Sequence, residues 1–164
     1  AGLAACFTEM RRVLRDGGRL VFSFQHRTPR GWDALAHALG VGGWQPVQVF
    51  PMLGNSSAGL HQHDGTINWD AVIVCRKGRV RSGGCSIGEQ AIDAARDHCA
   101  GWVARLKDVE NAPFREPDQT NLMRATLVAA SLGMFSVDGR RGRRPLQEAL
   151  DAAQKERTTD AAGQ

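Results

Sequence analysis

Amide, imidazole and guanidinium side chains suited to holding a nucleotide lie in two stretches of the chain. Residues 25–27 directly follow an apolar run, and a second polar stretch, rich in Gly, Ser, Asn and His, spans about 51–66. Amides and imidazoles can hydrogen-bond to a base edge, and a guanidinium suits a phosphate. The alternative, that the second stretch is a plain solvent-exposed connection, stays open. The candidate substrate-binding residues are Gln25, His26, Arg27, Asn55, His61 and His63.

Metal binding and nucleophilic catalysis receive little support from residue spacing. His61 and His63 alternate and could converge on one ion, but no spacing specifies a third or fourth ligand. The four cysteines form no CxxC pair, and no Ser/Asp or Cys pattern accompanies His26 or His37. We therefore predict no metal site and no catalytic residue, and we interpret three of the cysteines as small core residues: Cys6, Cys75 and Cys99.

The elements that position the candidate residues follow an α/β order. The apolar spacing over 3–16 predicts a helix, and Gly17-Gly18 ends it. A nearly continuous apolar strand over 19–25, typical of one covered on both faces, is followed by a helix that begins at Thr28-Pro29. Strands are predicted at 44–50, with Pro46 at a start or an edge, and at 67–76. Because no helix joins these two strands, we expect the last one to be antiparallel to its neighbours.

The second half of the chain is predicted to be helical. We assign 78–85 to a linker and 86–156 to a helical extension. Ser86 and Glu89 form a predicted capping box for a helix over 87–107, and Asp118 or Thr120 caps a helix that ends near 132. Pro145 opens a last helix to about 156, and 157–164 is a tail. The arginines between 140 and 144 are interpreted as a solvated loop in preference to a phosphate clamp.

Length and charge narrow the class of protein. A chain of 164 residues suits one domain, and no stretch approaches the ~18 uncharged apolar residues of a membrane span. No secretory signal opens the chain, so we expect a cytoplasmic protein without a membrane partner. The net charge of +4 is compatible with a polyanionic partner but is below that of a typical nucleic-acid-binding domain. The start at Ala1, with a helical pattern already running, suggests a part of a longer protein.

The stretch CFTEMRRVLRDGGRLVFSF resembles the helix, Gly-Gly turn and fifth strand of class I S-adenosylmethionine-dependent methyltransferases. HRTPRGWDALAHALGVGGWQPVQVFPM is similar to the next helix and sixth strand of a DNA adenine methylase group, and INWDAVIVCRK to its seventh strand. TNLMRATLVAASLGMF resembles part of that group's C-terminal helical extension. The resemblance implies an α/β fold: the C-terminal half of a Rossmann-like sheet, with three strands of which the last is antiparallel, over 1–77, followed by helices.

The chain lacks the parts of that family that carry its chemistry. The glycine-rich cofactor loop, the acidic residue for the ribose and the Asp/Asn-Pro-Pro-Tyr/Phe segment are absent, and the run Gly40–Gly43 ends a helix. The resemblance thus implies that S-adenosylmethionine is bound mainly by a segment upstream of Ala1. The complete protein is expected to methylate adenine amino groups in DNA, and this chain alone to be inactive. Two alternatives are a non-enzymatic α/β module that binds nucleic acid or a partner protein, and a fragment of an RNA or protein methyltransferase.

Overall fold

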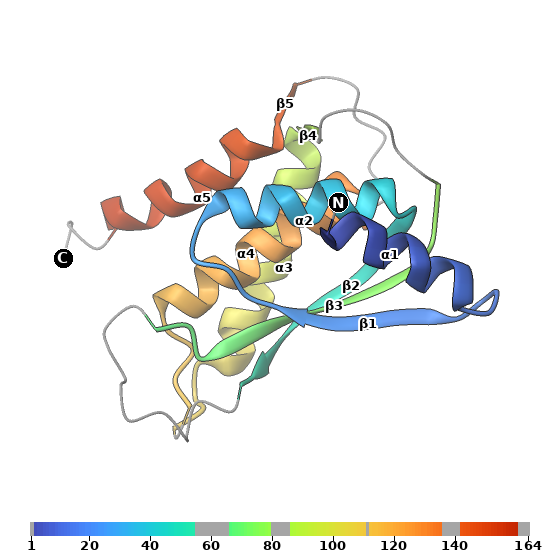
Figure 1. Ribbon diagram of the computed structural model, residues 1–164. Coiled ribbons are helices and arrows are strands. Elements are labelled where there is room, and N and C mark those ends of the chain that lie inside the picture. Colours follow the sequence, from blue (N-terminus) through green and yellow to red (C-terminus); the bar gives the residue numbers. More distant parts are fainter. Residues whose placement is uncertain (1, 55–65, 80–85, 111, 136–141, 161–164) are drawn as a thin grey trace.

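The described residues fold into a mixed α/β structure with five helices, a three-stranded sheet and a two-stranded ribbon (Figure 1). The computed structural model describes residues 2–54, 66–79, 86–110, 112–135 and 142–160, the last seven by backbone only. The elements are α1 (Gly2–Val13), β1 (Arg19–Phe24), α2 (Pro29–Val41), β2 (Trp44–Leu53), β3 (Trp69–Lys77), β4 (Ser86–Gly88), α3 (Glu89–Leu106), α4 (Glu116–Ser131), β5 (Arg143–Pro145) and α5 (Leu146–Asp160).

The sheet has the order β1-β3-β2, and β3 is antiparallel to both neighbours. Ile73, in the middle of β3, pairs with Phe22 on one side and Val49 on the other. The three predicted strands and the antiparallel direction of the last one are confirmed. Pro46 lies in the edge strand β2, where the register shifts before Gln48, as expected for a residue without a backbone donor.

Helices α1 and α2 cover one face of the sheet, above it in Figure 1. The Phe22 ring lies 5.4 Å from that of Phe7 in α1, and the Phe24 ring lies 4.8 Å from that of Trp32 in α2. The alternate residues of β1, including Val21, are exposed. The prediction that this strand is covered on both faces is therefore wrong for the described chain, because no described element packs over its second face.

Helix α4 is the central helix of the second half of the chain. Twelve of its sixteen residues are buried, since it contacts α2, α3, α5 and the strands β2 and β3. One hydrophobic core runs from the sheet through this helix, with Ile73, Trp32, Leu127 and Leu150 among its members. The predicted division at 77 and 86 thus separates stretches of sequence that share one core. No described helix combines the length and hydrophobicity that crossing a membrane requires.

Two predicted helix caps are wrong. Ser86 belongs to the short strand β4, which pairs with β5, and α3 begins at Glu89 after Gly88. Arg115 occupies the N-cap position of α4, and Asp118 lies at its third residue. The Asp118 carboxylate still caps the N-terminus of α4, because it accepts a hydrogen bond from the Arg115 backbone N–H at 3.0 Å.

Two further side-chain predictions fail. Cys75 and Cys99 are buried, as predicted. Cys6 is exposed, because Phe7 is the one residue of α1 whose side chain is buried. Arg144 lies in β5, where it forms an ion pair of 2.9 Å with Glu89, so this part of the predicted arginine loop is a strand. Residues 140 and 141 lie outside the described residues.

Candidate functional site

The predicted residues Gln25, His26 and Arg27 lie together at the carboxyl end of β1, with exposed side chains. Their backbone is held in place from α4. The His26 N–H donates to Oδ1 of Asn121 at 3.3 Å, and the Arg124 guanidinium donates to the Arg27 carbonyl at 2.8 Å. This end of the sheet therefore presents an amide, an imidazole and a guanidinium from a fixed backbone.

The His26 ring has a defined orientation. Its Nδ1 accepts a hydrogen bond from the Thr28 N–H at 3.1 Å, and the ring stacks on Phe24 with 6.3 Å between centroids. Gly31 gives the ring its space, because a Cβ at that position would lie 2.2 Å from Nδ1. With Nδ1 engaged locally, Nε2 is the ring nitrogen that can meet a ligand.

The other three candidates, Asn55, His61 and His63, lie outside the described residues. The segments that flank them are described. The Gly54 N–H donates to the Asn68 carbonyl at 2.8 Å, and Leu53 pairs with Trp69. The polar stretch therefore starts and ends at the same end of the sheet as Gln25, which is the arrangement predicted from strand direction.

Three buried polar residues on one face of α4 form a seam against this end of the sheet, at positions 118, 121 and 124. Oδ1 of Asp118 accepts the backbone N–H groups of Asn68 and Trp69, at 2.6 and 2.9 Å. Asn121 donates to the Trp69 carbonyl at 3.2 Å. The seam joins the end of β1 to the start of β3, so it sets the positions of residues on both sides of the candidate site.

Sequence reasoning missed this seam. The sequence pattern indicates a helix cap at Asp118 and no role for Asn121 or Arg124. The available signal was the spacing of three polar residues on the buried face of a helix. Burial raises the pKa of Asp118 against the opposing effect of its three backbone donors, and burial lowers the pKa of Arg124. Since backbone N–H groups occupy the carboxylate, its role is to position strands.

Next to the seam lie two buried polar atoms that have no hydrogen-bond partner among the described residues. They are the acceptor Oδ1 of Asn68 and the donor Nε1 of Trp69. An unmet buried polar group costs about 1–3 kcal/mol, so both atoms favour a polar neighbour at this end of the sheet. The Trp69 ring itself packs edge-on against Phe114, with centroids 5.6 Å apart.

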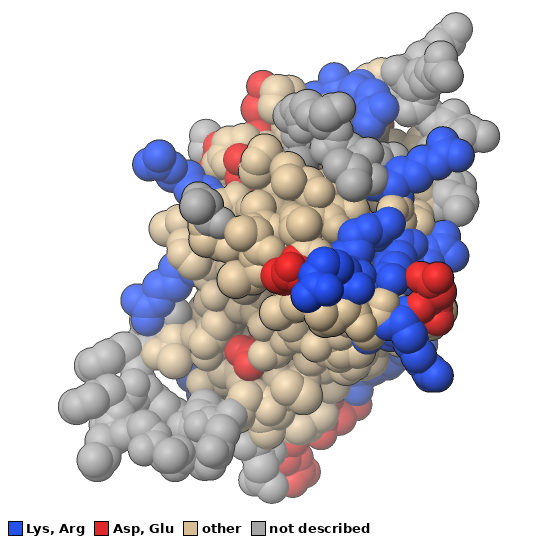
Figure 2. Space-filling view, turned by 45° about the vertical axis from the view of Figure 1, so that its right-hand side comes forward, with Lys and Arg blue, Asp and Glu red and all other residues tan. Residues whose placement is uncertain are grey.

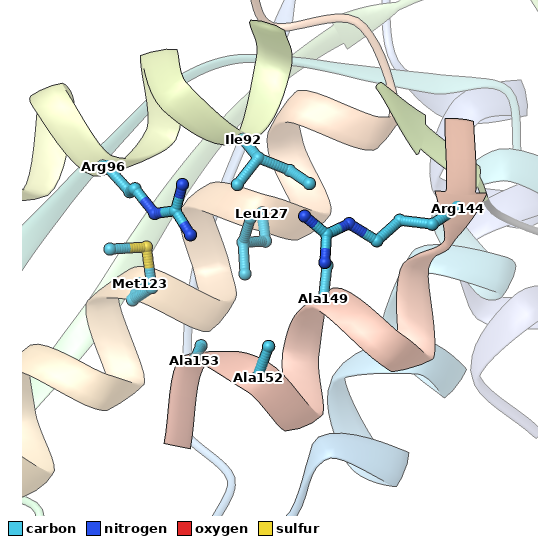
Figure 3. A pocket seen from close by; sticks show the side chains of 8 residues that line it. All are labelled: Ile92, Arg96, Met123, Leu127, Arg144, Ala149, Ala152 and Ala153. Carbon is cyan, nitrogen blue, oxygen red and sulfur yellow. The ribbon is translucent and has the colours of Figure 1, made fainter. Parts of the chain in front are cut away.

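A separate small pocket lies between α3, α4 and α5 (Figure 3). Ile92, Met123 and Leu127 contribute apolar walls, and Arg96 and Arg144 point into it from opposite sides. Its cavity volume of about 40 Å³ admits water but is far below the roughly 300 Å³ of a typical small-molecule site. This pocket therefore does not suit a nucleoside-sized cofactor.

The glycine run after α2 has a packing role. Gly42 caps the helix, and a Cβ there would lie 2.8 Å from Cβ of Phe7. Gly43 has a φ of 69°, a conformation that favours glycine. The residues present therefore do not fit a cofactor cradle between a strand and a helix. Among the described residues no group of three His, Cys, Asp or Glu side chains could hold a metal ion.

We compared the chain with models of protein families, with curated proteins and with solved structures. None of the three comparisons gave a match.

Proposed function

We propose that this chain is the C-terminal part of a class I S-adenosylmethionine-dependent methyltransferase that acts on adenine amino groups in DNA. The order helix, strand, helix, strand, strand supports it, as does the antiparallel direction of β3. Both agree with the fifth, sixth and seventh strands that the resemblance implies.

The observation that carries the proposal is the open side of β1. Among the described strands only β3 pairs with it, so its other edge carries unpaired backbone groups. Val21 is 56% exposed on the uncovered face of the strand, between Arg19 and Ser23. Met10 and Val13 of the adjoining helix α1 are exposed too. An exposed Val beside an unpaired strand edge favours a covering element, and a further strand and helix from the cofactor-binding half would supply one.

In this proposal the chain contributes the substrate side of the enzyme. A base methylated by such an enzyme must leave the DNA stack and be held by its edge. Gln25 and His26 offer donors and acceptors for that edge, and Arg27 suits a backbone phosphate. Cofactor binding falls to residues outside this chain, since the residues present do not fit it, and no catalytic step is assigned to this chain.

A non-enzymatic nucleic-acid-binding module is the second candidate. The observation that favours it is a group of arginines at the end of the sheet away from Gln25, where α1 ends, β1 begins and β3 ends. Phosphate contacts from such a group require no methyl transfer. A fragment of an RNA or protein methyltransferase would share the sheet and differ only in substrate.

Val21→Asp tests the proposal through burial. In the isolated 164-residue chain the change should cost about 0.5 kcal/mol, because the side chain is largely exposed. In the product of the complete reading frame it should cost about 3 kcal/mol or more, because an unpaired carboxylate would be buried. Ala104→Asp, at an exposed position of α3, is the matched control and should cost little in both. Equal small costs of Val21→Asp in the two proteins would contradict the proposal.

A further inference from the structure

Seven basic side chains gather at the end of the sheet where α1 ends, β1 begins and β3 ends. Among the described residues of these segments two carboxylates, Glu9 and Asp16, accompany them, which leaves five net positive charges there against +4 for the whole chain. Figure 2 brings this side of the molecule forward and shows Lys and Arg gathered on one part of it. This group, termed the basic end, comprises Arg11, Arg12, Arg15, Arg19, Arg76, Lys77 and Arg79.

Several contacts show that these side chains share one region. Arg19 and Arg76 are directly opposite each other in the register of β1 and β3. The ammonium of Lys77 lies 2.9 Å from the Asp16 carboxylate, which joins the end of β3 to the turn before β1. Arg11 donates to the carbonyl of Gly43, so α1 is bound to the start of β2 beside them.

Most of this charge is not neutralised by carboxylates. Arg12 pairs with Glu9 and Lys77 with Asp16. Arg19 instead donates to the Gly17 carbonyl at 3.1 Å, and Arg76 to the Gln45 side-chain oxygen at 3.0 Å, and both acceptors are neutral. The described residues supply no carboxylate within salt-bridge distance of four arginines: Arg15, Arg19, Arg76 and Arg79.

Arg19 and Arg76 place like charges directly opposite each other on neighbouring strands. Like charges directly opposite on neighbouring strands repel, and no described carboxylate lies between these two. The pKa of Asp16 is lowered by its hydrogen bond from Lys77, by the charge of Lys77 and by that of Arg11, as expected in a positive environment. An anion placed between the two arginines would relieve their repulsion.

A surface cleft of about 470 Å³ adjoins the end of β3 in this region and gives an anion room. Arg76, Lys77 and Arg79 line it together with Trp44 and Gln45. A guanidinium presents paired donors that match two oxygens of one phosphate, and six of the seven basic side chains are arginines.

We propose that the basic end binds the phosphate backbone of duplex DNA. The site lies at the opposite end of β1 from Gln25, His26 and Arg27, so it is separate from the candidate substrate residues. It would give sequence-independent affinity, and it does not depend on the proposed methyltransferase function.

Salt-dependent binding of the 164-residue chain to a labelled duplex of ~30 base pairs tests this proposal. If about four arginines contact phosphates, log Kobs should fall with log salt with a slope near −3.6. The double variant Arg19→Gln/Arg76→Gln should flatten the slope by about 1.8 and raise the Kd at ~100 mM NaCl by about tenfold or more.

Arg105→Gln/Lys107→Gln is the matched control, because it removes the same charge from exposed positions at the end of α3. It should leave the slope unchanged. Equal effects of the two double variants would overturn the proposal, as would a parent slope shallower than about −1. Tighter binding to phosphatidylserine vesicles than to the duplex, at the same salt and with the same loss in the double variant, would also overturn it in favour of a membrane surface.

Discussion

Asp118→Ala removes one carboxylate that three backbone N–H groups share. The N–H of Trp69 is buried, that of Asn68 is half-buried, and that of Arg115 lies at the N-cap of α4. Losing each of these three hydrogen bonds therefore costs a different free energy. An unmet buried donor costs about 1–3 kcal/mol, and a lost helix cap about 1 kcal/mol. The variant also no longer carries the desolvation cost of the buried Asp118 carboxylate, which offsets part of the lost free energy of unfolding. We expect the free energy of unfolding to fall by about 3 kcal/mol.

Asp118→Asn separates the two parts of this cost. It keeps one oxygen for Asn68 and Trp69 but turns an amide NH₂ toward the Arg115 N–H, so about 1 kcal/mol should be lost. Urea unfolding followed by tryptophan fluorescence measures both variants, with Asp93→Ala on the exposed side of α3 as the control, expected within about 0.5 kcal/mol of the parent. If Asp118→Ala were as mild as Asp93→Ala, the seam would not hold the strand ends and the reasoning would be refuted.

Three other changes test single features of the structure. Burial raises the pKa of Cys75 to about 12 from 9.0, so the unfolded chain loses this proton first and stability should fall as pH rises from 9 to 12. The decline in stability with pH should be shallower in Cys75→Ala than in the parent. Identical alkaline unfolding curves for the two proteins would contradict this prediction. Gly31→Ala places a Cβ against the His26 ring and should cost about 1–3 kcal/mol, most of which His26→Ala should restore in the double variant. If the double variant lost as much stability as Gly31→Ala alone, the added Cβ would not be clashing with the His26 ring. Arg19→Gln should raise the free energy of unfolding by about 0.2–1 kcal/mol, because it removes the repulsion from Arg76, and the gain should shrink at high salt. Destabilisation by this change at low salt would mean that the two charges do not repel.

The sheet was predictable because its signals are local. The first helix was predicted where it lies, although it ends at Val13, before the predicted end at 16, and Gly17, with a φ of 77°, belongs to the turn that leads into β1. Thr28-Pro29 begins α2 as the sequence indicates, and the helix-free link from β2 to β3 is enough to predict antiparallel pairing. The position of 25–27 at a sheet end follows from the strand alone.

The features that sequence analysis did not predict depend on contacts between residues that are distant in the chain. Ser86 has the spacing of a helix cap, but pairing with β5 takes it into a strand. Asp118 and Asn121 are ordinary polar helix residues until the start of β3 packs against them. The exposure of Val21 could not be seen in a strand whose composition is that of a buried one.

Transfer of labelled methyl groups from S-adenosylmethionine to DNA tests the central claim most directly. The assay compares the product of the complete reading frame with the 164-residue chain at equal concentration, and nucleoside analysis identifies the methylated base. We predict label on adenine with the complete product and none with the chain alone. A complete product that leaves DNA, RNA and protein unlabelled, or a 164-residue chain that transfers methyl groups by itself, would contradict the account.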